Sequence, residues 1–367
     1  MCNTVICCRV SPGQKREVVK LMKEQGNIIT LAIGDGANDV PMILEADGGV
    51  GLYGEEGMQS VQASDYAIGE FRFLWDLVLL HGRFNYLRQS EMIIYFFYKN
   101  IVFTIPQFFF GFYCAYSGQT VYDDWYITFY NMVFTSLPLM IRALFEKDID
   151  VPTRRKLKEV IPPADILSPN NDEEGIRPIP NTPYHKVRSE HPSNYDMGRE
   201  NKVFTVKNFG LNLFTGLIHS TIIFFIPLYT AQNGILKSNG RNQDFWSVSI
   251  TSFTCIILIV DLKLAVSTRL WNKIHFFTIT CLSLVLYFAF IFFYDQYSPL
   301  PSRFTLQELA SSAYFYLNII VTVSLVLSLD IAAGFFRRAF WPTKAEKLQN
   351  YLKREVSKKK VNVENSE

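Results

Sequence analysis

Two aspartates in the short segment Gly34–Asp39 have the spacing and surroundings of a magnesium site. Asp35 and Asp39 follow the apolar run Asn27–Ile33, which predicts a buried strand, and they stand where a helix is expected to begin. Two glycines in this segment let the chain turn tightly at the end of the strand. Because Mg²⁺ is usually held by one or two carboxylates together with phosphate and water, we predict that Asp35 and Asp39 bind Mg²⁺. Gly-Asp-Gly also occurs in plain turns in which the aspartate caps a helix.

A lysine and an asparagine could complete a phosphate-handling site around these aspartates. Lys15 stands at the start of a predicted helix, where a lysine can neutralise a phosphoryl group held beside the metal. Asn38, at the start of the next predicted helix, can hydrogen-bond a carboxylate or phosphate oxygen. Lys15 alone would be an ordinary surface lysine. Together with the aspartates it fits a phosphotransfer domain that works through an aspartyl phosphate, with Lys15 and Asp35 as its catalytic residues.

The elements that must position these residues alternate between strand and helix over residues 1–72. Strands are predicted at Val5–Val10, Asn27–Ile33 and Gly49–Leu52, with a fragment at Tyr66–Ile68, and helices at Gln14–Gln25 and Asn38–Ala46. This alternation predicts a parallel sheet, with ligands bound at the carboxyl ends of its strands.

The remaining sequence is far more apolar and is predicted to cross a membrane six times. Of the 367 residues, 49% are hydrophobic and only 19% are charged, which argues against a chain that is soluble throughout. A helix needs about 20 apolar residues to cross the hydrocarbon core. Six stretches meet this need, at approximately 92–115, 125–145, 208–229, 245–266, 274–294 and 313–336. Buried core helices are the alternative, and six of them in one chain are hard to accommodate.

Lysine and arginine are concentrated in alternate connections between these stretches. Residues 147–207, 267–273 and the tail after Phe336 hold 22 of them, whereas the other three connections hold 3. The excess of positive charge predicts that both termini and the first domain are cytosolic. The net charge of +2 gives no support to a nucleic-acid partner.

Three polar residues within the first two predicted spans could line a path through the membrane. Lys99 lies well inside the first span, where an unpaired lysine costs about 2.5–3.5 kcal/mol and so usually faces a polar path or partner. Asn100 and Asn131 supply polar groups at comparable depth. Lys99 could instead snorkel or pair within the bundle and serve packing alone.

Other charged residues of the spans are expected near their cytosolic ends. Arg142 is expected to snorkel towards water. Asp261 and Lys263 are expected to form a local pair or to lie at the interface, and Asp330 has no obvious partner in the sequence.

Several strings resemble the carboxyl-terminal part of the type IV P-type ATPases, the phospholipid flippases. Lys15 and the segment Gly34–Asp39 carry the general P-type signal. The flippase-like strings are Gly54-Glu55-Glu56-Gly57, His81-Gly82-Arg83, Tyr98-Lys99-Asn100, Tyr130-Asn131 with Phe134-Thr135-Ser136-Leu137-Pro138, and Pro192-Ser193-Asn194-Tyr195 with Gly198. The resemblance extends from Cys7 to about Arg338.

The resemblance implies a fold and a domain order. The fold is a partial HAD-like α/β phosphorylation domain with a parallel sheet, followed by an all-α polytopic membrane domain of six transmembrane helices. The implied order is the carboxyl-terminal part of the phosphorylation domain (1–72), a connecting helix (73–91), two transmembrane helices (92–145), a cytosolic loop (146–207), four transmembrane helices (208–336) and a basic cytosolic tail (337–367).

The resemblance also implies ligands and partners. ATP would be the energy source and Mg²⁺ the cofactor, with ATP bound by Arg9, Lys15, Asn38 and Asp39. A phospholipid headgroup would pass Lys99, Asn100 and Asn131. An accessory subunit with two spans is the implied protein partner.

One family motif is missing, and two other functions stay open. The Asp-Lys-Thr-Gly string that carries the phosphorylated aspartate does not occur, so the sequence is expected to be an incomplete portion that is inactive alone. A cation-transporting P-type ATPase is one alternative, although the first two predicted spans contain no acidic residue that could bind the ion. A non-catalytic, truncated membrane relative is the other.

Overall fold

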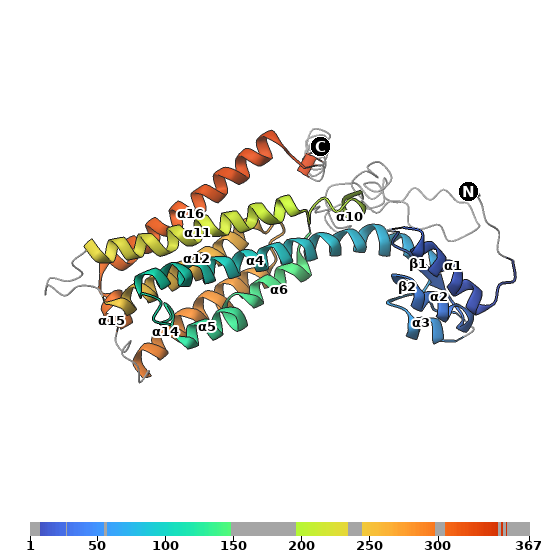
Figure 1. Cartoon of the computed structure of the whole chain (residues 1–367), viewed down its shortest axis with the longest axis horizontal. Helices are drawn as coiled ribbons and strands as arrows, with labels where there is room; N and C mark the ends of the chain where they lie inside the picture. The colour runs from blue at the N-terminus through green and yellow to red at the C-terminus, as the bar shows by residue number, and fades with distance from the viewer. Residues whose placement is uncertain are drawn as a thin grey trace, which may run out of the picture. The chain divides into compact units, whose positions relative to one another are not determined.

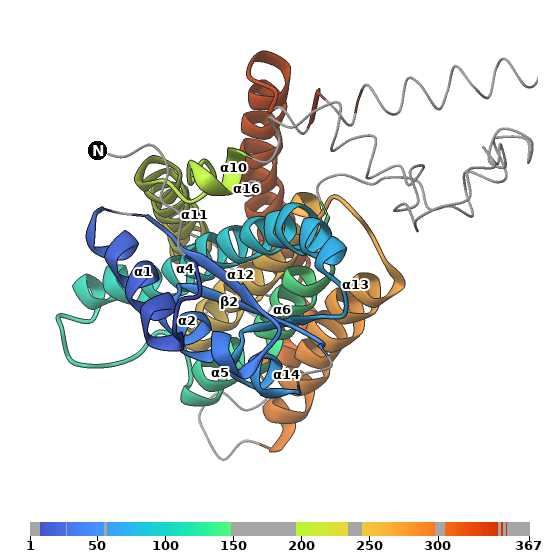
Figure 2. The same ribbon diagram turned by 90° about the vertical axis from the view of Figure 1, so that its right-hand side faces the viewer.

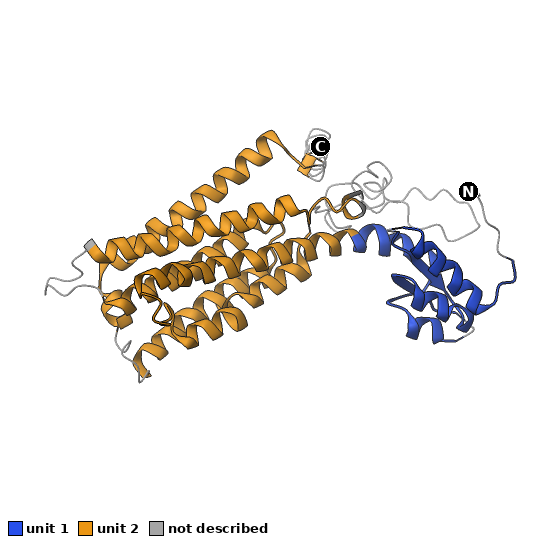
Figure 3. Ribbon diagram, viewed as in Figure 1, with its two compact units in different colours: residues 1–82, 175–178 blue, residues 83–174, 179–367 orange. Residues whose placement is uncertain are grey.

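The computed structural model of the protein describes residues 8–26, 28–54, 57–147, 196–233, 244–297 and 305–343, together with 346, 347 and 350 (Figure 1). The chain divides into two compact units (Figure 3). Unit 1 is formed mainly by the residues up to Gly82, and unit 2 mainly by those from Arg83 onward.

Unit 1 contains a small parallel sheet, as the sequence predicts. Its strands lie in the order β1–β2–β3, with Ile33 paired to Val50 and Val50 paired to Tyr66. The elements are α1 (Pro12–Glu24), β1 (Leu31–Gly34), η1 (Ala37–Asp39), α2 (Val40–Glu45), β2 (Gly48–Leu52), α3 (Gln59–Ala63), β3 (Tyr66–Ile68), η2 (Phe71–Phe73) and η3 (Asp76–His81). Ala32, Ile43, Val50 and Ile68 are its buried apolar residues.

The helix α1 begins with a capping box. The backbone N–H of Gln14 donates to the Ser11 hydroxyl, and the N–H of Ser11 donates to the Gln14 side-chain oxygen. Pro12 fits the first turn because its missing N–H would have no partner there. The strand predicted at Val5–Val10 lies mostly outside the described residues. Its described part is not a strand, since Arg9 has a φ of 50° that interrupts an extended run.

Unit 2 is helical. The described residues contain six helical segments long and apolar enough to cross a membrane, in agreement with the predicted number. These segments are Phe71–Tyr113, Asp124–Phe145, Val206–Gln232, Phe245–Ser267, Lys273–Tyr297 and Ala313–Phe340, the first of which begins in unit 1. Their helices are α4 (Gly82–Tyr113), α5 (Asp124–Phe129), η4 (Tyr130–Phe134), α6 (Ser136–Phe145), α11 (Val206–Asn233), α12 (Phe245–Ser267), α13 (Lys273–Phe277), η6 (Thr278–Val285), α14 (Leu286–Tyr297) and α16 (Ala313–Phe340). Two short helices, α10 (Asp196–Arg199) and α15 (Thr305–Ala310), lie between them.

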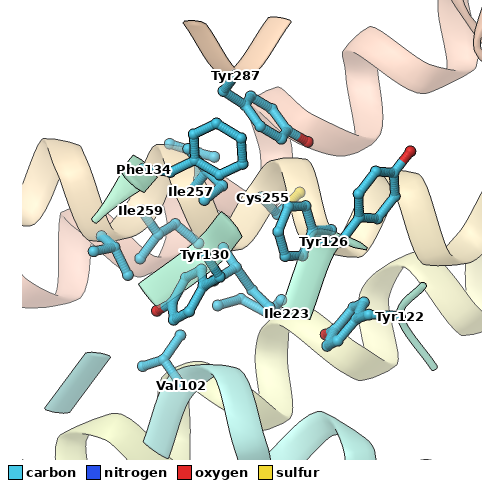
Figure 4. Packing of buried hydrophobic residues seen from close by; sticks show 14 of the residues in the cluster. Val102, Tyr122, Tyr126, Tyr130, Phe134, Ile223, Cys255, Ile257, Ile259 and Tyr287 are labelled. Atoms are coloured by element: carbon cyan, nitrogen blue, oxygen red, sulfur yellow. The ribbon is translucent and has the colours of Figure 1, made fainter. Parts of the chain in front are cut away.

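The helix α12 forms the centre of the bundle, where α6, α11, α15, α16 and η6 pack against it (Figure 2). The most apolar stretch of α12 is 72% buried, whereas the corresponding stretches of the other membrane-length segments are 11–33% buried. Small hydroxyl residues allow this close packing. The hydroxyls of Thr251 and Thr254 donate hydrogen bonds to carbonyl groups of their own helix and so need no other partner. Figure 4 shows the aromatic rings of Tyr126, Tyr130 and Phe134 in one buried cluster with Cys255 and Ile257 of α12.

Candidate functional site

In unit 1, Asp39 folds back onto the end of strand β1. A Cβ atom placed on Gly34 would lie 2.2 Å from the Cβ of Asp39, so only glycine leaves room for this side chain. The short 3₁₀ turn η1 produces this reversal between β1 and α2. Asp35, the residue after β1, is exposed beside Gly54, where an added Cβ would lie 3.2 Å from the Asp35 carbonyl oxygen. Both aspartates therefore lie at the carboxyl end of β1.

The side chain of Lys15 reaches this end of the sheet from α1. Its Nζ lies 2.6 Å from Oδ1 of Asp39, and the two side chains are 31% and 13% exposed. This half-buried ion pair brings together two predicted site residues that are 24 positions apart. Arg9 and Asn38 are both exposed.

The donor set at this site suits magnesium better than a metal held by protein ligands alone. Among the described residues, no three His, Cys, Asp or Glu side chains are grouped so that they could hold a metal ion. Asp35 and Asp39 provide two carboxylates. Mg²⁺ commonly uses only one or two carboxylates and completes its shell with phosphate oxygens and water. The predicted magnesium role is therefore compatible with the residues present.

In unit 2, Lys99 is completely buried among neutral oxygen atoms. Its Nζ donates to Oγ1 of Thr135 at 2.8 Å, to Oδ1 of Asn131 at 3.2 Å and to Oγ of Ser136 at 3.4 Å. The rings of Phe96 and Tyr130 lie 5.4 and 5.6 Å from the same Nζ. Lys99, Asn131, Thr135 and Ser136 are called the Lys99 cluster below.

A π-helical turn aligns the residues that face Lys99. The segment η4 separates α5 from α6, and the backbone N–H and hydroxyl of Thr135 both donate to the carbonyl of Tyr130. The hydroxyl of Tyr130 donates to the Lys99 carbonyl at 2.7 Å, which ties this turn to α4. Asn131 and Thr135 then point to the same place, and single-turn π segments often occur at functional sites.

Sequence reasoning identified only part of this cluster. Thr135 and Ser136 were not predicted, although their positions four and five residues after Asn131 in an apolar span were a usable signal. Asn100 is half-buried, and among the described residues it has no hydrogen bond to the cluster. Consecutive helix residues point about 100° apart, so Asn100 cannot share the direction of Lys99.

The expected positions of the other charged residues need correction. Arg142 does not snorkel: it is 6% exposed, and its Nη2 lies 2.6 Å from Oε2 of Glu91. Oε2 of Glu146 lies 4.0 Å from Nε of Arg142. Burial raises the pKa of the Glu146 carboxyl, although the backbone N–H of Arg269 donates a hydrogen bond to it. The acidic neighbours make burial of Arg142 tolerable because they balance its charge.

Asp261 and Lys263 do not pair with each other. Lys263 lies 3.0 Å from Asp330 of α16, which supplies the partner that the sequence did not reveal. Asp330 also lies 3.6 Å from His219, whose other ring nitrogen is 2.7 Å from the Tyr98 hydroxyl. Asp261 accepts a hydrogen bond from Ser283 instead. Asp261 and Lys263 contact different neighbours because residues two positions apart on a helix point to different sides of it.

The described part of the chain combines six membrane-length helical segments with a small parallel α/β unit and a buried lysine within the bundle, which define an integral, multi-pass membrane protein. Residues 61–343 match the family model described as phospholipid-translocating P-type ATPase C-terminal. The chain belongs to this family, as the strings in its sequence predicted.

Curated relatives agree with this assignment. The chain is 35% identical over 360 residues to phospholipid-transporting ATPase IC of Homo sapiens, covering 96% of this chain and 26% of that protein. It is 35% identical over 359 residues to phospholipid-transporting ATPase FetA of Mus musculus, covering 96% of this chain and 27% of that protein. For the Xenopus tropicalis ATPase IC, the identity is 36% over 357 residues, with 95% and 26% covered. The chain thus spans about a quarter of the length of these relatives.

Proposed function

We propose that this chain supplies the membrane path and part of the phosphorylation domain of an ATP-driven phospholipid translocase. The observation that carries the proposal is the Lys99 cluster. A fully buried ammonium group, held only by neutral oxygens among its hydrogen-bond partners, lies within a span of a phospholipid-translocating family. Such a group keeps its attraction for an anion, and the phosphate of a lipid headgroup is the anion that this family would present.

Unit 1 would support phosphoryl transfer. Lys15 would neutralise charge on the phosphoryl group, while Asp35 and Asp39 would hold Mg²⁺, which supplies further charge neutralisation when bound. Arg9 and Asn38 would contact ATP from the exposed surface beside them. Because the sequence contains no Asp-Lys-Thr-Gly string, the aspartyl phosphate would form on an aspartate outside this sequence, and this chain alone would be inactive.

In the bundle, the headgroup would pass Lys99 and Asn131, with Thr135 and Ser136 as further hydrogen-bonding groups. Asn100, the next residue on α4, would contact the headgroup from an adjacent side of that helix. Both termini would be cytosolic, in line with the concentration of lysine and arginine in alternate connections. A two-span accessory subunit, implied by the family resemblance, would be the protein partner.

Uptake of fluorescent phospholipid by the protein expressed from its complete gene tests the membrane half of the proposal. Lys99→Ala removes the ammonium group, and loss of a charged hydrogen bond of about 1.5–3 kcal/mol lowers lipid uptake roughly 10- to 100-fold. Lys202→Ala is the matched control, because Lys202 is an exposed lysine of the same unit. Equal uptake by the Lys99 variant and the wild type would contradict the proposed path.

The same preparation separates the two alternative functions. ATP hydrolysis that needs no lipid and depends on an ion other than Mg²⁺ would favour a cation pump. Absence of any ATP turnover or lipid uptake in the correctly folded protein would favour a non-catalytic relative.

A further inference from the structure

The oxygen atoms around the Lys99 ammonium differ in their exposure. Thr135 is 1% exposed, and Tyr130, whose carbonyl accepts the Thr135 hydroxyl, is completely buried. Ser136 is half-buried and Asn131 is exposed. In the described part of the chain, a ligand therefore approaches Lys99 from the side of Asn131 and Ser136.

An exposed aromatic ring also lies beside the Lys99 ammonium. Phe96 stands three residues before Lys99, so both side chains lie on the same face of α4. The centre of the Phe96 ring is 5.4 Å from Nζ of Lys99, and Phe96 is 45% exposed. The ring of Tyr130, at 5.6 Å, is completely buried. Of these two rings, Phe96 is the one that a molecule bound at Lys99 would contact.

The oxygen atoms of the Lys99 cluster are already engaged. The Lys99 ammonium has three N–H groups and donates to a side-chain oxygen of each of the other three members. A second ammonium group with N–H donors would compete with Lys99 for these oxygens. A quaternary ammonium has no N–H group and needs no acceptor, and the face of an aromatic ring is its usual partner in proteins.

We infer that Phe96 determines headgroup specificity, because its ring receives a quaternary ammonium when the lipid phosphate binds at Lys99, and so favours a choline headgroup over one with a primary ammonium. This inference rests on the proposed function and adds a substrate class to it. In a choline headgroup, two carbon atoms join the ammonium to the phosphate ester oxygen. The 5.4 Å between Nζ and the ring centre is short enough for one headgroup to contact both, since cation–π contacts extend to about 6 Å from the ring centre.

The aromatic face, and not apolar bulk, carries this preference. Phe96→Leu keeps an apolar side chain but removes the ring. A cation–π contact at a partly exposed site corresponds to a factor of about two to ten. The ratio of phosphatidylcholine to phosphatidylethanolamine transport is therefore expected to fall about two- to tenfold. Phe96→Tyr keeps a ring and should keep the ratio of the wild type. A role for Phe96 in packing alone would lower transport of both lipids and leave their ratio unchanged.

The experiment compares three fluorescent lipids with the same acyl chains in vesicles that contain the protein expressed from its complete gene. Phosphatidylcholine carries a quaternary ammonium, phosphatidylethanolamine a primary ammonium, and phosphatidylglycerol no cation. The matched control is Phe97→Leu, because Phe97 is also 45% exposed and its ring contacts Phe209 at 5.2 Å. Transport rates are measured for the wild type, Phe96→Leu, Phe96→Tyr and Phe97→Leu.

The inference requires that the wild type, Phe96→Tyr and Phe97→Leu prefer phosphatidylcholine to phosphatidylethanolamine. It also requires that Phe96→Leu loses this preference without a change in phosphatidylglycerol transport. An unchanged ratio in Phe96→Leu, or an equal shift in Phe97→Leu, overturns the inference. If Phe96→Leu does not fold, the wild type decides, because transport of phosphatidylethanolamine as fast as phosphatidylcholine overturns it. Failure of the wild type to transport any of the three lipids would instead reject the proposed function, and the inference with it.

Discussion

Two lysines, one in each unit, have opposite surroundings, because one is partly exposed beside a carboxylate and the other is buried among neutral groups. Lys15 is half-exposed and forms a 2.6 Å ion pair with Asp39. Lys99 is fully buried, and among the described residues its ammonium group contacts neutral oxygens and aromatic rings alone. Lys15 therefore has a charged partner at a place where water would also stabilise it, whereas Lys99 has neutral partners in the described part of the chain and is shielded from water.

The difference shows how solvent determines what each lysine can do. An ion pair that solvent partly screens contributes little to stability, so Lys15 can exchange the Asp39 carboxylate for a phosphoryl group at small cost. The hydrogen-bond partners of Lys99 among the described residues are all neutral, so an anion that reaches Lys99 meets no carboxylate that it must displace. The comparison predicts that Lys15 matters for activity more than for stability, whereas the Lys99 cluster matters for both.

The largest expected effect separates activity from stability at Lys15. Lys15→Met is expected to lower ATP-dependent phosphorylation about 10²- to 10³-fold, because the charge that neutralises the phosphoryl group is lost. The free energy of unfolding of unit 1 should change by less than about 1 kcal/mol. Radiolabelled phosphate incorporation and thermal unfolding measure the two effects. Lys20→Met, an exposed lysine on α1 that lies 3.9 Å from Glu24, should leave both unchanged.

A substitution in the Lys99 cluster is expected to lower the free energy of unfolding. Thr135→Val preserves shape but removes the 2.8 Å hydrogen bond to the Lys99 ammonium. Loss of a hydrogen bond to a charged group is expected to cost about 1.5–3 kcal/mol. Thermal unfolding of the detergent-solubilised protein measures this loss. Thr128→Val is the control, since its exposed hydroxyl bonds only a carbonyl of its own helix, and a cost as large as that of Thr135→Val would contradict the comparison.

The geometry around Lys15 depends on a glycine. Gly34→Ala would place a Cβ atom 2.2 Å from the Cβ of Asp39. The clash is expected to cost about 1–3 kcal/mol and to displace Asp39 from Lys15. Hydrogen exchange at the amides of β1 and η1 would report the local loss. Gly13→Ala has open space around it and should not destabilise α1; similar exchange in both variants would show that the close approach of Asp39 is not required.

The smallest expected effect concerns an exposed carboxylate of unit 1. Hydrogen bonds from the Thr30 backbone N–H and from Lys23 lower the pKa of Asp47 from 3.8 to about 2. Because the pKa is lower in the folded state, the stabilisation is complete above about pH 4 and is lost as the pH falls through about 2. Asp47→Asn should therefore flatten the acid limb of the stability profile of unit 1 between pH 4 and 2. An unchanged acid limb in denaturant titrations of this variant would contradict the assignment.

Much of the architecture could be predicted from local sequence. Apolar stretches of membrane length predict the six helices, and alternating strands and helices predict the parallel sheet, because both signals depend on neighbouring residues. The turn after β1 was likewise visible in its two glycines. The clash of a Cβ at Gly34 with Asp39 explains why the first of them is needed.

The partners of the charged residues in the helical bundle could not be predicted in this way. Arg142 pairs with Glu91 and Lys263 pairs with Asp330, residues that are 51 and 67 positions apart. Hydropathy places each residue within a span, but it does not say which helices touch or which faces meet.

The sequence by itself determined that the chain enters the membrane and carries a lysine inside a span. Only the tertiary structure decided that a π-helical turn brings Thr135 and Ser136 to Lys99, and that Asp330 lies beside Lys263. The physical reason is that hydrophobicity is a property of each residue, whereas hydrogen bonds and charge balance depend on how packed helices are rotated about their axes.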